Sequence, residues 1–255
     1  MVKRLTELFL LISLIVTSTA CAVSQAPPAI VPEYDEYIEY EEYIDAHQVY
    51  LLPPYTTYGY MSVETALANR RSHRNFQDRA LSLDQVSQIL WAAYGITLPL
   101  PDVPGLRGGL RTTPSAGAIY PLEIYIVIGN VEGIRPGVFR YISEEHKLVR
   151  IIDGDIRDEL SAATWGQRMV SEAPVSVFYS AVFERMLPRY GERGIRYTYI
   201  ELGHSAQNVY LQAEALGLGT VAVGAFDDDR VRQILNLPDD EDPMYIMPVG
   251  YFYSD

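Results

Sequence analysis

The spacing of apolar residues changes repeatedly between residues 61 and 255, and these changes predict helices interleaved with strands. Spacings of three and four residues predict helices at 62–69, 83–94, from 155 onward, at 195–216 and around 231–235. Alternating or short continuous apolar runs predict strands at 122–128, 138–142, 148–152, 175–180, 220–223 and 244–253. Because the order has no strict β–α–β rhythm, it predicts an α+β layer fold.

Local signals fix the ends of several predicted helices. Ser82 and Gln85 form a capping box at the start of the second helix, which Gly95 closes. Gly217 is expected to cap the long helix, which is long enough to cross a domain core. The strand at 122–128 alternates well enough to predict that it is half-buried.

Residues 1–22 have the pattern of an export segment. Two basic residues supply a positive start, and the apolar run at 8–16 is too short for a spanning helix. Small residues precede the only cysteine, Cys21, which predicts a lipoprotein-type site where that thiol is lipidated. Cleavage after Ala22 and an uncleaved anchor are the alternatives. We therefore expect an extracytoplasmic protein that is membrane-attached through this segment or secreted.

Residues 23–60 change character and are expected to form an arm or linker before a domain at 61–255. Prolines bracket a run in which tyrosine recurs every three residues among seven acids and no base, between Glu33 and Asp45. This composition is typical of a solvated spacer. The alternative is a short helix whose tyrosine stripe docks on the catalytic domain or on a partner.

Charge and cysteine content exclude several function classes. With 20 basic and 33 acidic residues the net charge is −13, so nucleic acid is not an expected partner. A negative total still permits a phosphate-bearing cofactor, because a few local Arg side chains can hold one in a cleft. One cysteine allows no intramolecular disulfide, and no metal site is predicted because the histidines lack partners at ligand spacing.

Three short segments contain the kinds of residue that bind a planar, phosphate-bearing cofactor. The first gathers guanidinium groups and a hydroxyl, which clamp a phosphate by charge-assisted hydrogen bonds: Arg70, Arg71, Ser72 and Arg74. The second, residues 112–121, is a loop of small residues whose backbone can approach a ring closely. The third, residues 215–226, is a helix end, a strand and a glycine turn. Each segment alone is ambiguous, since a basic helix C-terminus also satisfies the helix dipole.

Taken together in this order, the three segments resemble the FMN-dependent nitroreductase family, and more closely its SagB-type branch, which includes azoline oxidases. The resemblance covers about residues 61–253 and includes the stretch 201–208, which is similar to the branch's long central helix. It implies a nitroreductase-like fold, with a central, mostly antiparallel sheet flanked by helices. It also implies a homodimer with the flavin at the interface.

The resemblance implies a role for each segment. The basic segment holds the FMN phosphate with Arg70, Ser72 and Arg74, and with added contact from Arg71. The loop matches one that a second subunit lays over the isoalloxazine ring: Pro114, Ser115, Ala116 and Gly117. The third segment matches backbone that faces the flavin N5 edge, where a hydride arrives or leaves: Val223, Gly224 and Ala225. Gly224 and Ala225 are therefore the main catalytic candidates.

The chain departs from the family pattern at several positions. Simple nitroreductases have an asparagine at the position of Ala118 and an acid at that of Gly224, and the SagB-type branch tolerates both changes. Azoline oxidases of the branch use a Lys-Tyr pair that aligns with Arg189-Tyr190. Arginine does not readily give up a proton, so this pair argues against azoline oxidation and leaves Tyr190 as a catalytic candidate.

Two residues of the long predicted helix complete the candidate set. Glu201 is a candidate to orient His204 or to bind substrate. His204 is expected to be a hydrogen-bonded core histidine rather than a base.

These observations predict an exported, homodimeric FMN oxidoreductase that exchanges hydride through flavin N5 with a small or peptidic substrate. The electron donor or acceptor is not assigned, and a membrane-borne quinol is one candidate because NAD(P)H is scarce outside the cytoplasm. Two alternatives stay open. One is a nitro- or quinone reductase that uses NAD(P)H, and the other is a flavin-free or flavin-sensing envelope binding module.

Overall fold

The computed structural model describes residues 49–253, so the predicted export segment and the tyrosine-rich run lie outside the described residues. A seven-stranded sheet, ordered β1-β6-β5-β4-β7-β9-β8, forms the centre of this part and is antiparallel at every pairing. Its strands are β1 (Val49–Leu51), β4 (Leu122–Ile128), β5 (Gly137–Ile142), β6 (Lys147–Asp153), β7 (Val175–Ala181), β8 (Gly219–Thr220) and β9 (Asp242–Gly250). The expected α+β class with an antiparallel sheet is confirmed.

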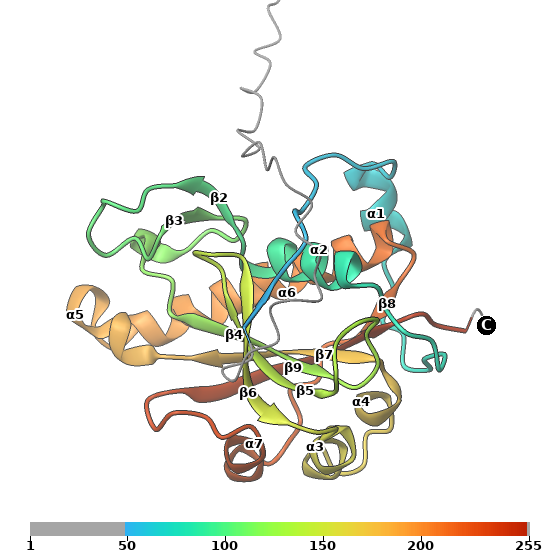
Figure 1. Ribbon diagram of the computed structural model, residues 1–255. Helices are drawn as coiled ribbons and strands as arrows, with labels where there is room; N and C mark the ends of the chain where they lie inside the picture. Colours follow the sequence, from blue (N-terminus) through green and yellow to red (C-terminus); the bar gives the residue numbers. More distant parts are fainter. Residues whose placement is uncertain (1–48, 254–255) are drawn as a thin grey trace, which may run out of the picture. The chain divides into compact units, whose positions relative to one another are not determined.

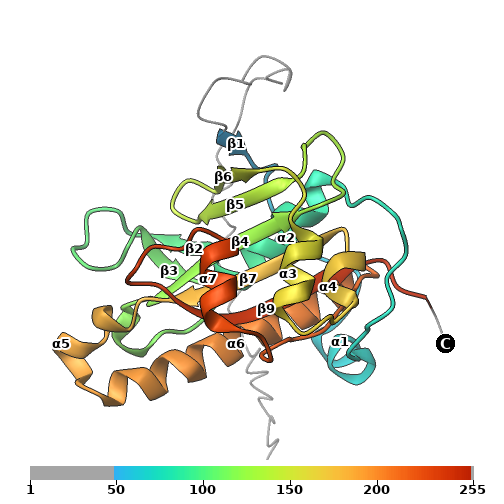
Figure 2. The same cartoon turned by 90° about the horizontal axis from the view of Figure 1, so that it is seen from below.

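Helices cover both faces of the sheet (Figures 1 and 2). One face packs against α2 (Leu83–Tyr94) and α6 (Arg193–Ala215), and the other against α3 (Arg157–Ala163) and α7 (Asp228–Ile234). The remaining helical segments are α1 (Val63–Asn69), α4 (Met169–Glu172), α5 (Leu187–Tyr190) and the 3₁₀ turns η1 (Ala116–Ala118) and η2 (Phe183–Arg185). The sheet therefore separates two hydrophobic cores.

The central strand β4 is buried along its whole length, so the expectation of a half-buried strand was wrong. Ile124 and Ile126 belong to the core on the α6 side, whereas Tyr125 and Val127 belong to the core on the α7 side. Because helices cover both faces of the sheet, successive side chains of β4 point into one core and then the other. Neither set of side chains faces solvent.

The helix ends predicted from capping residues are confirmed. Ser82 and Gln85 make both hydrogen bonds of the capping box at the start of α2, and Gly95 is the residue at which α2 ends. Gly217 follows the last turn of α6 with a φ of +68°, a left-handed conformation that glycine adopts without steric cost.

Several short elements were not predicted, among them β1, α4, α5 and a separate two-stranded sheet of β2 (Ile96–Pro99) and β3 (Gly109–Arg111). Each has three or four residues, too few to establish a period. Strand β1 pairs with β6, and Leu52 is buried beside it. The sheet thus includes residues from the stretch assigned to the arm or linker.

Helix α6 is the support on which the candidate site is built. Its 23 residues cross the sheet, and Ser205 Oγ lies 2.6 Å from the Ala93 carbonyl of α2 and 3.0 Å from Tyr179 Oη of β7. One buried hydroxyl thus connects two helices and the sheet. Across residues 49–253, no helix has both the length and the apolar composition that a membrane crossing requires.

Candidate functional site

The basic segment and the glycine-turn segment meet at Tyr210 of α6. Ser72 Oγ lies 3.2 Å from Tyr210 Oη, and the Arg70 guanidinium lies 5.3 Å from the centre of the same ring. From the other side, the Ala222 N–H donates to Tyr210 Oη at 2.9 Å. Ser72 also pairs as an isolated β-bridge with Thr220. The fold therefore brings together two segments that are about 150 residues apart in the sequence.

The four predicted phosphate-binding residues are not equivalent. Arg71 turns back onto α1, where its Nη1 donates to the carbonyls of Ala68, Asn69 and Arg70 and so satisfies the C-terminal end of that helix. Arg70 is half-buried and Arg74 is exposed. Within residues 49–253, neither makes an ion pair with a carboxylate.

The residues of this corner fit an anionic phosphate group. The Arg70 guanidinium, which has no carboxylate partner within residues 49–253, and the Ser72 hydroxyl are donors of the kind that bind phosphate oxygens. Thr220, which pairs with Ser72, has a buried Oγ1 with no hydrogen-bond partner in the described residues. A bound ligand could provide that hydrogen bond.

The predicted ring-covering loop has a strained and closely tied backbone. Gly117 has a φ of +63°, and the non-glycine residues Ala118 and Tyr120 also have positive φ values of +54° and +56°. Ser115 holds the turn together, because its Oγ accepts from the Tyr120 N–H at 2.9 Å and its carbonyl accepts from the Ala118 N–H at 3.0 Å. Such backbone conformations persist only where the surroundings determine them.

The Arg189–Tyr190 pair of α5 lies against this same loop. Arg189 Nη1 donates to the Gly117 carbonyl at 3.3 Å. A Cβ added to Gly117 would lie 2.6 Å from both Arg189 Nη1 and Tyr190 Oη, so a larger residue there would displace the ends of both side chains. The candidate Tyr190 is thus brought together with the loop of residues 114–117.

The glycine turn continues from the sheet into an exposed backbone segment. Val223 is buried and pairs with Ile246, whereas Gly224 and Ala225 are exposed. A Cβ added to Gly224 would lie 3.1 Å from the Tyr245 ring. Among the described residues, the N–H groups of Gly224 and Ala225 donate to no protein acceptor, and the Ala225 carbonyl accepts from Gln167 Nε2 at 2.9 Å. Two adjacent N–H groups are therefore available to a ligand.

Glu201 is buried in the interior of α6, with 1% of its surface exposed. Tyr94 Oη donates to its Oε1 at 2.5 Å, while its Oε2 has no hydrogen-bond partner in the described part. Burial raises the pKa of Glu201 to about 7, although the hydroxyls of Ser115 and Tyr94 and nearby guanidinium charges act in the opposite direction.

His204 does not accompany Glu201 into the core, so the expectation of a core histidine was wrong. The residue is exposed, whereas Glu201 and Leu202 before it and Ser205 and Ala206 after it are buried. Its position on α6 lies beside the buried stripe and not within it. The structure therefore gives Glu201 other partners than His204.

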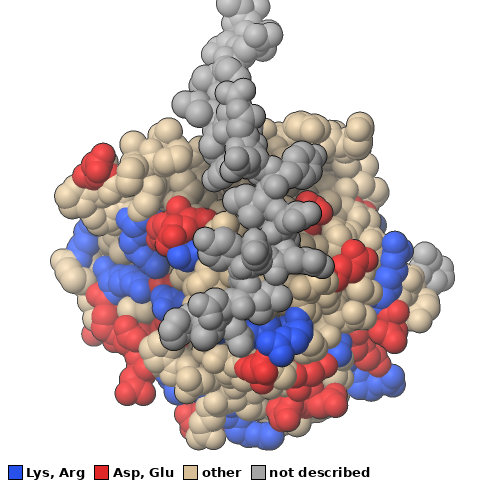
Figure 3. Space-filling model, viewed as in Figure 1, with Lys and Arg blue, Asp and Glu red and all other residues tan. Residues whose placement is uncertain are grey.

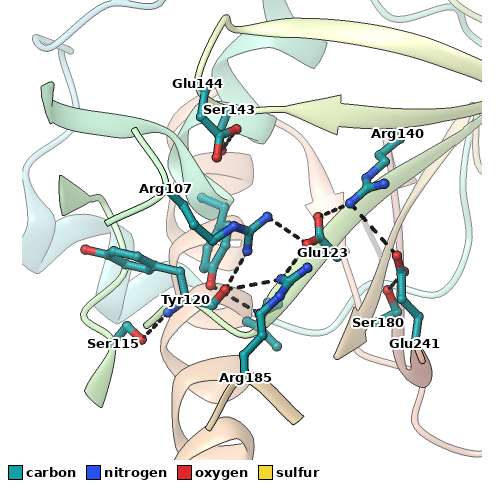
Figure 4. A network of polar contacts seen from close by, with 12 residues as sticks. Arg107, Ser115, Tyr120, Glu123, Arg140, Ser143, Glu144, Ser180, Arg185 and Glu241 are labelled. Atoms are coloured by element: carbon teal, nitrogen blue, oxygen red, sulfur yellow. Dashed lines mark hydrogen bonds and ion pairs between the residues drawn. The ribbon is translucent and has the colours of Figure 1, made fainter. Parts of the chain in front are cut away.

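An arginine-rich network that the sequence did not reveal supports the loop (Figure 4). Glu123 of β4 pairs with three guanidinium groups, those of Arg107 at 2.7 Å, Arg140 at 2.9 Å and Arg185 at 2.5 Å. Burial raises the pKa of Glu123, but these three charges outweigh the burial and hold that pKa below its usual value. Arg107 Nη1 also donates to the Tyr120 carbonyl at 2.6 Å.

A second missed residue, Arg111 of β3, fixes the other side of the loop. Its guanidinium is buried over the rings of Tyr94 and Tyr120, 4.6 and 4.9 Å from their centres, and pairs with Glu144 at 2.9 Å. No sequence spacing connects these residues, because each comes from a different element. Only the tertiary contacts around Arg111 could reveal them.

Residues 67–251 match the sequence profile of the Nitroreductase family. The chain belongs to the nitroreductase family. Because the match covers most of the described residues, membership rests on the whole domain and not on one motif. The resemblance drawn from the three segments is confirmed, and the family is one of oxidoreductases.

Three relatives define the extent of the similarity. The chain is 46% identical over 190 residues to the nitroreductase-family protein MJ1384 of Methanocaldococcus jannaschii, covering 74% of this chain and 91% of that protein. It is 27% identical to the microcin B17-processing protein McbC of Escherichia coli, covering 64% of this chain but only 60% of McbC. A solved nitroreductase-family structure from Ralstonia eutropha matches with a TM-score of 0.67 and 30% identity, covering 81% of this chain and 90% of that one.

Proposed function

We propose that this chain is an FMN-dependent oxidoreductase that acts on a small or peptidic substrate. The observation that carries the proposal is the corner at Tyr210, where Arg70 and Ser72 meet the backbone of Thr220 to Ala222. This corner has the donors that a phosphate requires and lies on the same helix as the buried carboxyl of Glu201. Membership of the nitroreductase family makes the phosphate of a flavin the group that this corner would hold.

Each part of the site has a separate task in this proposal. Bound FMN would supply two-electron redox chemistry, which none of the surrounding side chains supplies. Arg70, Ser72 and Arg74 would hold the phosphate, and the free N–H groups of Gly224 and Ala225 would orient the ring. The loop of residues 114–117 would limit the access of water, and Tyr190 beside Gly117 would contact the substrate.

Replacing Arg70 and Ser72 together with alanine tests the phosphate corner. Losing two charge-assisted or hydroxyl contacts should weaken FMN binding by at least about 100-fold, measured by fluorescence titration of flavin-free protein. Arg168→Ala is the matched control, because the Arg168 side chain is 86% exposed and, within residues 49–253, forms an ion pair only with Glu172 on α4. Equal FMN affinity in the double variant and the control would contradict the assignment.

The visible spectrum of the purified protein separates the proposal from the flavin-free alternative. Flavin absorption bands that survive gel filtration support the oxidoreductase. Colourless protein that added FMN does not reconstitute would instead support an envelope binding module. Oxidation of NAD(P)H by the FMN-loaded protein with menadione as acceptor would identify the nitro- or quinone-reductase alternative.

The similarity to McbC favours a peptidic substrate over a small one. McbC is described by its name as a processing protein for microcin B17, and the match covers 60% of its length. In this chain, Arg189 occupies the position next to Tyr190 where azoline oxidases of the branch have lysine. We therefore propose a peptidic substrate whose reaction does not require a lysine base.

The apolar residues on the N-terminal half of α6 support the proposal of a homodimer. Large hydrophobic side chains are 39 to 56% exposed there, at Ile195, Tyr199 and Ile200. They line a shallow hollow of about 780 Å³ together with Glu192, Arg193 and Arg196. A second copy of the chain would cover this face.

We also propose that the N-terminal segment attaches the protein to the outer side of a membrane. The support is the sequence alone, since Cys21 lies outside the described residues. Cys21→Ser should move the protein from the membrane fraction to the soluble fraction and abolish incorporation of radiolabelled palmitate. Labelling that persists in this variant would contradict lipidation. On the part of the described surface visible in Figure 3, both acidic and basic side chains are present.

A further inference from the structure

The carboxyl group of Glu201 is held in a state that suits proton exchange. It is 1% exposed, accepts one hydrogen bond at Oε1 from Tyr94 Oη, and has no partner at Oε2 within the described residues. A buried carboxylate with so few donors is costly, and its pKa of about 7 leaves both protonation states populated near neutral pH.

Ser115 is placed to connect this carboxyl with the loop. Its Oγ accepts from the Tyr120 N–H at 2.9 Å, which leaves its own hydrogen free to be donated. The Ser115 hydroxyl also interacts with the Glu201 carboxyl and favours its charged form. The residue itself is only half-buried, whereas Glu201 is fully buried.

The other charged and titratable groups around Glu201 are already engaged. Arg111 from β3 pairs with Glu144, and Arg107 from the loop before β3 pairs with Glu123. Burial raises the pKa of Tyr94 from α2 and that of Tyr120 from the loop, so both phenols stay protonated. The pKa of Glu201 is raised, whereas those of Glu64, Glu123 and Asp155 are lowered.

We propose, building on the proposed flavin function, that Glu201 exchanges a proton with the substrate through the Ser115 hydroxyl. A substrate oxidised by two electrons loses two hydrogens, one with the electron pair to the flavin and one as a proton. Ser115 Oγ takes that proton from the substrate and passes its own hydrogen to Glu201 Oε2. In reduction, the neutral carboxyl returns the proton by the same route. Glu201 is thus a positioning residue that acts through Ser115.

Infrared pH-difference spectroscopy of the full chain tests the charge state without any substrate. In the wild type, the C=O band of a protonated carboxyl should disappear as pH rises through about 7. Glu201→Gln should lack this band, and Glu241→Gln should keep it. Glu241 is the matched control, since it is a buried carboxyl that accepts from Tyr125 at 2.9 Å and from Ser180 at 2.5 Å.

A reaction arm tests whether the proton is used. The FMN-loaded protein is reduced chemically, and its reoxidation by menadione is followed by stopped flow. Reduction of a quinone to a hydroquinone takes one hydride, which the flavin transfers, and one proton, which the neutral Glu201 carboxyl supplies. The wild-type rate should therefore fall as pH rises through about 7 and this carboxyl loses its proton. Glu201→Gln should react about 100-fold more slowly and without this inflection. Ser115→Ala should also lose the inflection, and Ser115→Thr should keep it because it retains a hydroxyl.

The outcomes separate this proposal from the function on which it rests. A wild type with no carboxyl titrating near pH 7, or a Glu201→Gln variant that keeps the rate and the inflection, overturns the proton role alone. Protein that binds no FMN overturns the proposed function and this proposal with it. If Glu201→Gln does not fold, the wild-type band and the Ser115 variants still decide between these outcomes.

Discussion

Two buried carboxyl groups of the site have opposite pKa shifts, because their partners differ. The Glu123 side chain is 5% exposed and meets three guanidinium groups, which keep it ionised despite its burial. Glu201 is as deeply buried but meets a phenol hydroxyl in place of a cation at hydrogen-bond distance. The same side-chain chemistry therefore serves as a fixed ionic anchor in one place and as a titrating group in the other.

The raised pKa of Glu201 predicts how stability depends on pH. The usual pKa of a glutamate is 4.5 and that of Glu201 is about 7, so between these values the folded state binds more protons than the unfolded state. The contribution of this group to folding is then fully present below 4.5 and decreases as pH rises towards 7, by about 3 kcal/mol in total. Glu201→Gln should remove this decrease, as measured by urea unfolding across the same window.

The test compares how the free energy of unfolding changes with pH in the wild type and in Glu201→Gln. The absolute stabilities of the two proteins are not compared. Glutamine keeps the shape of the side chain but does not titrate, so the difference between wild type and variant should shift in favour of the variant as pH rises. A difference that stays constant between pH 4.5 and 7 would show that Glu201 has an ordinary pKa.

At the scale of elements, α6 combines positions of close packing with positions open to solvent. Near its start, a Cβ added to Gly194 would lie 2.5 Å from Met186 Cβ, in the segment that leads into α5. Nine residues later, a Cβ added to Gly203 would meet no atom within 4 Å. The two glycines have the same helical backbone but different surroundings.

These surroundings predict opposite effects for the same substitution. Gly203→Ala should stabilise the domain by about 0.5–1 kcal/mol, because alanine restricts the unfolded chain and fits the helix. Gly194→Ala should destabilise it by about 1–3 kcal/mol, because the added methyl group displaces Met186 and with it α5. Urea unfolding of both variants provides the measurement. A concentration-dependent loss of stability in Gly203→Ala would place that face of α6 in contact with a second copy.

At the scale of the whole molecule, helices cover both faces of the sheet in the described domain. Apolar side chains nevertheless remain exposed on α6. Ile200 is 49% exposed and Tyr199 56%. Such a patch is expected to be an interface in a soluble protein. It adjoins the α5 segment that carries Arg189 and Tyr190, so a second copy on this face would lie next to the candidate site.

Placing a charge in the patch tests this interpretation. Ile200→Glu should convert the protein from two chains to one in sedimentation velocity and lower its retention of FMN, because a carboxylate buried in an apolar contact is unfavourable. Leu98→Glu on β2 is the control, since Leu98 is 51% exposed but lies outside the patch. A dimer that survives in Ile200→Glu would place the interface on another surface.

The amino-acid sequence by itself determined the longer helices and strands and the ends of several helices. Periods of two and of three to four residues report backbone conformation directly, and the capping residues Ser82 and Gly217 act on their own neighbours. The three short segments around Arg70, Ser115 and Gly224 were equally local, and their order was enough to indicate the family before any contact was known.

Only the tertiary structure decided which groups share an environment. Tyr94 and Glu201 are 107 residues apart, and Glu123 meets arginines from three separate elements. A buried position for Glu201 and an exposed one for His204 follow from which side of α6 packs on the sheet. Burial and charge partners set a pKa, and both arise from long-range packing that no short sequence window contains.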